Sequence, residues 1–166
     1  MLDSVKRMRE LAKDLRDAKS VLFLGRNVGY PIAMEGALKL KELAYIHAEG
    51  FAAGELKHGP IALIEPGQPV IVIVPSPNGE DSLHPKVVSN IQEIKARGAT
   101  VIAIAEDGDQ EVVKYADEVF YIPQTHPFMA AQLSVLPLQI FAMELASAKG
   151  LDVDQPRNLA KSVTVE

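Results

Sequence analysis

The stretch Val70-Ile-Val-Ile-Val74, which ends at Pro75, decides the fold of this chain. It is a short run in which every residue is apolar, so a strand formed by it would be buried on both faces, as the strands of parallel sheets are. Three more short runs are mostly apolar in the same way, and they cover residues 21–25, 100–104 and 118–122. We therefore predict four strands of a parallel sheet.

Segments with helical spacing of apolar residues lie before, between and after these strands. They cover residues 3–17, 31–46, 84–97, 109–116 and 127–149, and we expect Pro137 to bend or interrupt the last of them. Alternating strands and helices predict a three-layer α/β/α sandwich with a mainly parallel sheet, similar to flavodoxin and Rossmann folds. Ligands of such folds bind at the carboxyl ends of the strands, so the loops after Gly25, Val74 and Ala105 are of most interest.

Composition excludes several classes of protein. The chain of 166 residues is 48% hydrophobic, which suits one domain with a core; we place that domain at 1–150 and a polar tail at 151–166. A net charge of -5 and only 5% aromatic residues argue against a nucleic-acid partner. Zero cysteines exclude disulfides and a cysteine nucleophile within this chain, and they fit a cytoplasmic location. No apolar run approaches the ~18 residues of a membrane span, so we expect no membrane association and no signal peptide.

One predicted helix, 31–46, carries a stripe of charged residues. Glu35, Lys39 and Glu42 fall within about 60° of one another, whereas most of the remaining circumference is apolar. Charges on a buried helix must be paired or must line a cleft, because an isolated buried charge is too costly. Two interpretations stay open: a structural Glu–Lys pair, or one wall of a site.

The histidines give weaker signals. His58 lies in the turn 54–60, where it could transfer a proton near neutral pH or could simply be solvated. His47, His84 and His126 have no companion ligands at metal-binding spacing, so we expect no metal site.

Two loops are candidates for a phosphate site. The loop 25–29 lies between a strand and a helix, but it lacks Ser, Thr and the G-x-G-x-x-G pattern. The loop 75–82 contains Glu80 and Asp81, which would repel a phosphate. We therefore expect this chain alone to bind sugar phosphates weakly.

The tail holds a single lysine, Lys161, among Leu159, Ala160 and Val163. A chain end usually frays, because it buries too little surface to offset its ordering entropy. The alternative is that the tail delivers Lys161 into a cleft, where its amine acts on a carbonyl group.

Four segments together carry a specific resemblance. They are Phe23-Leu-Gly-Arg-Asn27, Glu35-Gly-Ala-Leu-Lys-Leu-Lys-Glu42, residues 48–60 and residues 154–166. Across essentially the whole chain they resemble the last sugar isomerase (SIS) domain of the glucosamine-6-phosphate synthase family, the isomerising glutamine–fructose-6-phosphate aminotransferases. That family has an N-terminal glutaminase domain and two SIS domains, and Ser/Thr-rich loops of the first SIS domain hold most of the sugar phosphate.

The resemblance implies a function and its residues. This chain would be the second half of an isomerase module that converts fructose 6-phosphate to glucosamine 6-phosphate without a cofactor, within a homodimer that also contains the first SIS domain and the glutaminase domain. Lys161 matches the lysine that forms a Schiff base with the open-chain ketose, and Glu42 matches the base that moves a proton between C1 and C2. His58, from the neighbouring subunit, would assist ring opening. Lys39 would shuttle a hydroxyl proton; Glu35 would support it, and Ala160 would contact substrate.

Two other functions are compatible with the sequence. The chain could bind sugar phosphates without catalysis, or it could serve mainly for dimerisation through the apolar helix 127–149 or the helix 31–46. In either case we expect no synthesis of glucosamine 6-phosphate by this chain alone, because it has no cysteine and no glutaminase segment.

Overall fold

The computed structural model describes residues 2–79 and 82–158 of the chain. Its five-stranded sheet is parallel throughout, with the strand order β2-β1-β3-β4-β5. The strands are β1 (Ser20–Gly25), β2 (His47–Ala52), β3 (Pro69–Ile73), β4 (Thr100–Glu106) and β5 (Glu118–Ile122). The α-helices are α1 (Leu2–Asp14), α2 (Gly29–Ala44), α3 (His84–Lys95) and α4 (Pro127–Ala148). Short 3-10 helices are η1 (Ala53–His58), η2 (Pro60–Leu63) and η3 (Val112–Lys114).

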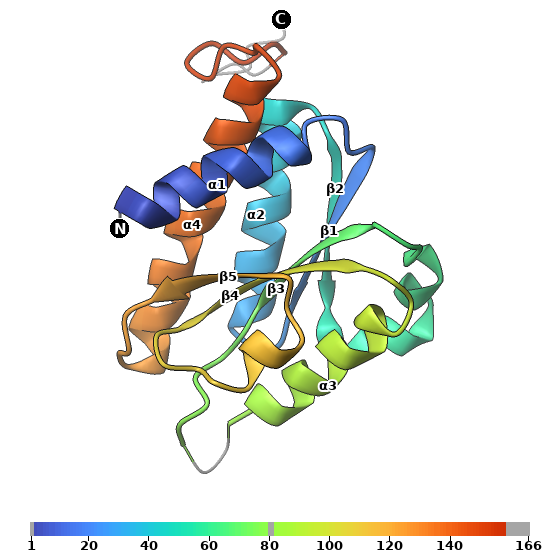
Figure 1. Cartoon of the computed structure of the whole chain (residues 1–166), viewed down its shortest axis with the longest axis vertical. Coiled ribbons are helices and arrows are strands. Elements are labelled where there is room, and N and C mark those ends of the chain that lie inside the picture. The colour runs from blue at the N-terminus through green and yellow to red at the C-terminus, as the bar shows by residue number, and fades with distance from the viewer. Residues whose placement is uncertain (1, 80–81, 159–166) are drawn as a thin grey trace, which may run out of the picture.

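The helices form two layers on opposite faces of the sheet (Figure 1). One face packs against α1, α2 and α4 and includes Phe23, Ile71 and Ile102. The other face packs against α3 and η1 and includes Leu24 and Val72. Each central strand therefore contributes side chains to both cores, and this double burial is what its continuous apolar run predicts. The three-layer α/β/α fold is confirmed.

The fifth strand, β2, was not predicted from the sequence. It pairs only with β1, at the edge of the sheet, and Ala48 is its only buried residue. A half-exposed edge strand needs no continuous apolar run, so its sequence, His-Ala-Glu-Gly-Phe-Ala, carries little strand signal. Gly50 lets β2 lie against α2, because a Cβ there would come within 2.8 Å of the Met34 Cα.

Two helical predictions need correction. Pro137 does not interrupt helix α4, although proline cannot donate to the carbonyl four residues earlier, and a bend there stays a prediction. Buried residues such as Ser134, Leu138 and Phe141 lie on both sides of the proline, so tertiary packing holds both halves of the helix. The predicted helix 109–116 is only the single turn η3. The other three helices form; their first residues differ from the prediction by at most two positions, and their last residues by two or three.

By length and composition, α4 is apolar enough to cross a membrane, which the absence of a long uninterrupted apolar run had not suggested. The helix nevertheless lies beside α1 and α2, and its residues Ala142, Leu145 and Ala146 belong to the core. Its apolar character is accounted for in part by this packing.

Candidate functional site

Helix α2 carries the charged stripe that the sequence predicts. The Lys39 Nζ lies 2.6 Å from the Glu42 Oε2 and 3.6 Å from the Glu35 Oε1. The side chains of Lys39 and Glu42 are 25% and 22% exposed, so the pair is half-buried. The hydrogen bond to Glu42 raises the pKa of Lys39 above its ordinary value. Lys39 is therefore a cation at neutral pH, able to donate a proton or a hydrogen bond.

A pocket of about 530 Å³ opens beside this stripe. Its lining consists of Lys41, Glu42, Tyr45, Ile46, His47, Arg157 and Asn158. The volume is within the usual range for small-molecule sites. The pocket thus joins the last turn of α2, the start of β2 and the beginning of the tail.

The position of this pocket differs from the expectation for doubly wound folds. His47 is the first residue of β2 and pairs with Ser20, the first residue of β1, so the pocket lies at the amino edge of the sheet. Because α2 runs antiparallel to the strands, its last turn arrives at the same edge (Figure 1). The loops after Gly25, Val74 and Ala105 lie at the opposite, carboxyl edge.

The beginning of the tail is attached to the end of α2. The backbone N–H of Arg157 donates to the Tyr45 hydroxyl over 2.6 Å, and the Arg157 guanidinium lies 4.1 Å from the centre of the Tyr45 ring. Tyr45 caps α2 in the left-handed conformation, with φ 55°. Residues 160 and 161, predicted to contact substrate and to form the Schiff base, lie outside the described residues.

His58 is not brought to this pocket. It is the exposed last residue of η1, which follows the carboxyl end of β2. Six residues of strand separate the two ends of β2, which corresponds to roughly 17 Å at ~3.3 Å per residue. Within one chain, Glu42 and His58 therefore belong to opposite edges of the sheet.

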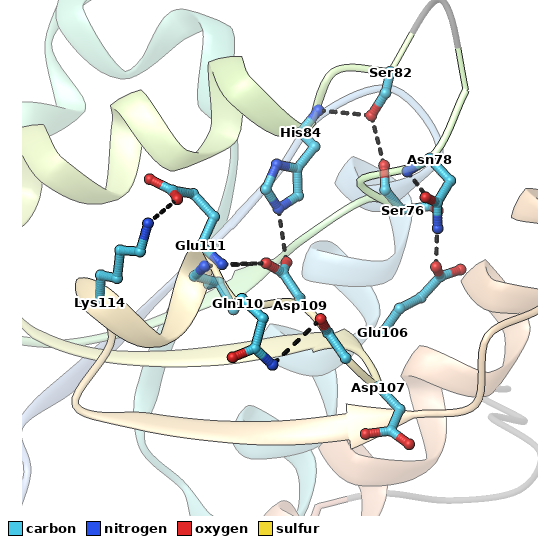
Figure 2. Close-up of polar contacts among 12 residues, drawn as sticks. Ser76, Asn78, Ser82, His84, Glu106, Asp107, Asp109, Gln110, Glu111 and Lys114 are labelled. Atoms are coloured by element: carbon cyan, nitrogen blue, oxygen red, sulfur yellow. Dashed lines mark hydrogen bonds and ion pairs between the residues drawn. The ribbon is translucent and has the colours of Figure 1, made fainter.

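A second polar network occupies the carboxyl edge of β3 and β4, and Figure 2 shows its members. The His84 Nε2 lies 2.7 Å from the Asp109 Oδ2, and both residues are buried. The other Asp109 oxygen accepts from the backbone N–H groups of Glu111 and Val112. Sequence reasoning missed this pair, because its members are 25 residues apart: His84 is the first residue of α3, and Asp109 lies in the segment after β4.

The same network includes Glu106, the last residue of β4. Ser76 donates its hydroxyl hydrogen to the Glu106 Oε2 over 2.7 Å, whereas the buried Oε1 has no hydrogen-bond partner among the described residues. Among those residues, no group of three or more histidine or carboxylate side chains could hold a metal ion. This edge is thus built mainly from pairs that satisfy one another.

The loop 25–29 offers few free donors to an anion. The N–H groups of Gly29 and Tyr30 donate to the carbonyls of Arg26 and Asn27, at 2.9 and 3.0 Å. The guanidinium Nε of Arg26 donates to Asn90 over 3.2 Å. Weak phosphate binding at this loop stays a prediction.

Comparison with known proteins adds independent information. The SIS domain family matches residues 14–149. Glutamine–fructose-6-phosphate aminotransferase (isomerizing) from Leifsonia xyli subsp. xyli is 74% identical over 166 residues, which is all of this chain and 27% of that relative. The protein of the same name from Corynebacterium glutamicum is 67% identical over the same shares. The solved C-terminal domain of glucosamine-fructose-6-phosphate aminotransferase from Francisella tularensis is 40% identical, with a TM-score of 0.84 over 93% of this chain and 42% of that one.

These matches agree with one another over nearly the whole chain. The chain spans about a quarter of the length of the curated relatives that it matches. It belongs to the SIS domain family.

Proposed function

We propose that this SIS domain is the second half of the isomerase module of a glutamine–fructose-6-phosphate aminotransferase, which forms glucosamine 6-phosphate from fructose 6-phosphate. The observation that carries the proposal is the pocket at the amino edge of the sheet, because it brings Glu42 and the start of the tail around one cavity. The likeness to aminotransferases at 67–74% identity supports the same conclusion.

The tail has the reach that this function needs. Asn158 lines the pocket with Glu42, and Lys161 follows it by three residues. Three residues extend over at most about 10 Å, and the lysine side chain adds to that reach. The proposal therefore treats 1–150 as the domain and 151–166 as the segment that supplies the active-site lysine and Ala160.

The reaction divides among the residues as follows. The Lys161 amine adds to the open-chain ketose carbonyl at C2 and forms an imine with loss of water, and ammonia then displaces the lysine at the same carbon. The Glu42 carboxylate takes a proton from C1 and returns it to C2, while the C1 hydroxyl loses its proton and becomes the aldehyde. Lys39, held as a cation beside Glu42, hydrogen-bonds the oxygen at C1 and relays the hydroxyl proton to the nitrogen on C2, where the imine becomes the amine of the product.

Two further parts of the site come from outside one copy of this chain. His58 lies at the edge opposite Glu42, so in this proposal it serves the pocket of a neighbouring subunit in a homodimer. Phosphate is held by the first SIS domain, and ammonia comes from the glutaminase domain. Four exposed apolar side chains support docking of a second SIS domain or subunit on the layer formed by α2 and α4. They are Met34 and Leu38 on α2, and Leu136 and Met143 on α4. A cytoplasmic setting, without membrane or nucleic acid, completes the proposal.

The test is a hybrid in which this chain replaces the matching quarter of the Leifsonia xyli relative. We expect the hybrid to synthesise glucosamine 6-phosphate, and Lys161→Arg to lower synthesis at least about 10³-fold, because guanidinium does not deprotonate in the working range. Glutamine hydrolysis should persist in both. Lys149→Arg, at an exposed lysine, is the matched control. Near-normal synthesis by the Lys161→Arg hybrid would refute the proposal.

Mixed dimers test the role of His58. We expect hybrids carrying His58→Ala or Glu42→Gln to be inactive alone. Equal mixing after subunit exchange should restore about a quarter of the normal synthesis, because half of the dimers are mixed and each then has one intact site. No recovery in dimers proven to be mixed would place His58 outside the partner's site.

A further inference from the structure

We infer that Tyr45 is a positioning residue that fixes the tail at the pocket and thereby sets the approach of Lys161 to Glu42. The inference rests on the proposed function, but its central observation is separate. Tyr45 makes two different contacts with one tail residue, Arg157: one to the backbone N–H and one to the guanidinium.

The chain before Arg157 is already directed toward this contact. Gly150 adopts φ 72° after α4, and Leu151 N–H donates to the Ala146 carbonyl over 3.0 Å, which ends the helix with a defined reversal. Next, the Asp152 Oδ1 accepts from the N–H groups of Asp154 and Gln155, which forms a local turn. The residues from 150 to 155 thus follow a restricted path.

Beyond that turn, the contacts with Tyr45 hold the backbone of Arg157. The hydrogen bond from the Arg157 N–H to the Tyr45 hydroxyl, 2.6 Å from nitrogen to oxygen, fixes the distance of the tail backbone from the end of α2. The guanidinium over the ring face adds a cation–π contact at 4.1 Å. Asn158 then adopts the left-handed conformation, with φ 59°, which turns the chain immediately after the contact.

Tyr45 is itself held in an unusual conformation. Its φ of 55° is uncommon for an aromatic residue and persists where the surroundings determine it. The residues on either side, Ala44 and Ile46, are both buried in the core. The ring is therefore presented by a rigid junction between α2 and β2, three residues after Glu42. The proposed base, Glu42, and the residue that holds the tail, Tyr45, lie on the same short segment, so local structure sets their relative position.

Sugar-binding or helix-capping roles alone would not require the contact with Arg157. The most direct readout is therefore the rate at which trypsin cleaves the tail after Arg157. Intact-mass spectrometry of the 166-residue chain measures this rate as the loss of residues 158–166. Cleavage under native conditions follows the fraction of time that the segment is released. We expect Tyr45→Phe, which retains the ring and loses the hydroxyl, to speed this cleavage about threefold to fivefold. Tyr45→Ala, which loses both contacts, should speed it about tenfold or more.

The matched control is Tyr121→Ala, at an exposed tyrosine on the edge strand β5, with no expected effect on tail cleavage. Thermal unfolding of each variant separates release of the tail from loss of the fold. Cleavage rates for Tyr45→Ala that equal those of the wild type, or of Tyr121→Ala, would overturn the anchor.

Positioning also requires a catalytic readout that a purely structural contact would not change. In the hybrid enzyme, Tyr45→Ala should lower kcat of synthesis about tenfold with little change in glutamine hydrolysis, and Tyr45→Phe should recover most of it. Faster cleavage with unchanged synthesis would overturn the positioning role. If instead Lys161→Arg leaves synthesis normal, the proposed function fails, while the cleavage assay still decides whether Tyr45 holds the tail.

Discussion

The two edges of the sheet carry polar clusters of opposite character. At the carboxyl edge, His84 and Asp109 are buried, and Asp109 satisfies three donors from two segments of the chain. At the amino edge, Glu42 and Lys39 form a half-buried pair, and Glu42 lines a pocket together with the tail residues Arg157 and Asn158. Buried groups that satisfy one another stabilise a fold, whereas partly exposed groups beside a cavity remain available to a ligand. Burial, more than the kind of residue, separates the two roles.

The largest effect should come from removing the general base, Glu42, at the amino edge. In the hybrid enzyme, Glu42→Gln should lower synthesis by about 10² to 10⁴, because the amide cannot accept the C1 proton. Thermal stability should change little, since the amide can still accept a hydrogen bond from Lys39. Product formation is measured together with unfolding temperature. If Glu42→Gln lost synthesis only because it unfolds, Glu42 would stabilise the fold as His84 and Asp109 do, and the two edges would not differ in role.

Asp109→Ala, at the carboxyl edge, should lower stability, which Glu42→Gln should leave almost unchanged. It removes the acceptor of the His84 ring and of the Glu111 and Val112 N–H groups, so the free energy of unfolding should fall by about 2–4 kcal/mol. Urea denaturation of the 166-residue chain gives this value. The control Asp107→Ala, at an exposed neighbour, should stay within about 0.5 kcal/mol of the wild type. Equal losses in the two variants would mean that the buried pair adds no stability of its own.

An ion pair between α1 and α4 sharpens the comparison through its pH dependence. The Arg9 guanidinium donates two hydrogen bonds to Glu144, and they lower the pKa of that carboxyl below its ordinary value of 4.5. A lowered folded-state pKa gives stability that is present above the ordinary pKa and is lost as the pH falls through the folded value. Glu144→Gln should therefore cost about 1 kcal/mol at neutral pH and progressively less below pH 4.5.

That difference between wild type and Glu144→Gln is measured by urea denaturation from pH 7 to pH 3. Glu10→Gln, at an exposed carboxylate on the same helix as Arg9, provides the control. A cost for Glu144→Gln that does not shrink in acid would show that the pair is held by shape and packing, with no contribution from ionisation.

The smallest effect belongs to the outer member of the stripe. The Glu35 Oε1 lies 3.6 Å from Lys39, and the side chain is 37% exposed, so Glu35→Gln should change the free energy of unfolding by less than about 0.5 kcal/mol. Synthesis by the hybrid should fall only severalfold. A loss as large as that of Glu42→Gln would move the functional centre of the stripe from its last turn to its middle.

Much of this fold follows from local sequence. The apolar runs of β1, β3 and β4 predict buried parallel strands, because their residues face cores on both sides of the sheet. The run of β5 also predicts a strand, but that strand lies at the edge of the sheet and buries only Phe120 and Ile122. The spacing of Glu35, Lys39 and Glu42 predicts one stripe, since helical geometry fixes the angle between them. These features depend on periodicity alone, so a single sequence is enough to find them.

Other features were decided only by tertiary structure. The sequence of β2 carries no apolar run, and its pairing with β1 exists because α2 delivers it to an open edge. The His84–Asp109 pair and the Tyr45–Arg157 contact join residues 25 and 112 positions apart, which no local pattern encodes. The same holds for the separation of Glu42 from His58: both stood in recognisable motifs, but only the direction of β2 through the sheet places them at opposite edges. Local propensity determines the elements, and the packing of elements onto one another determines which side chains meet.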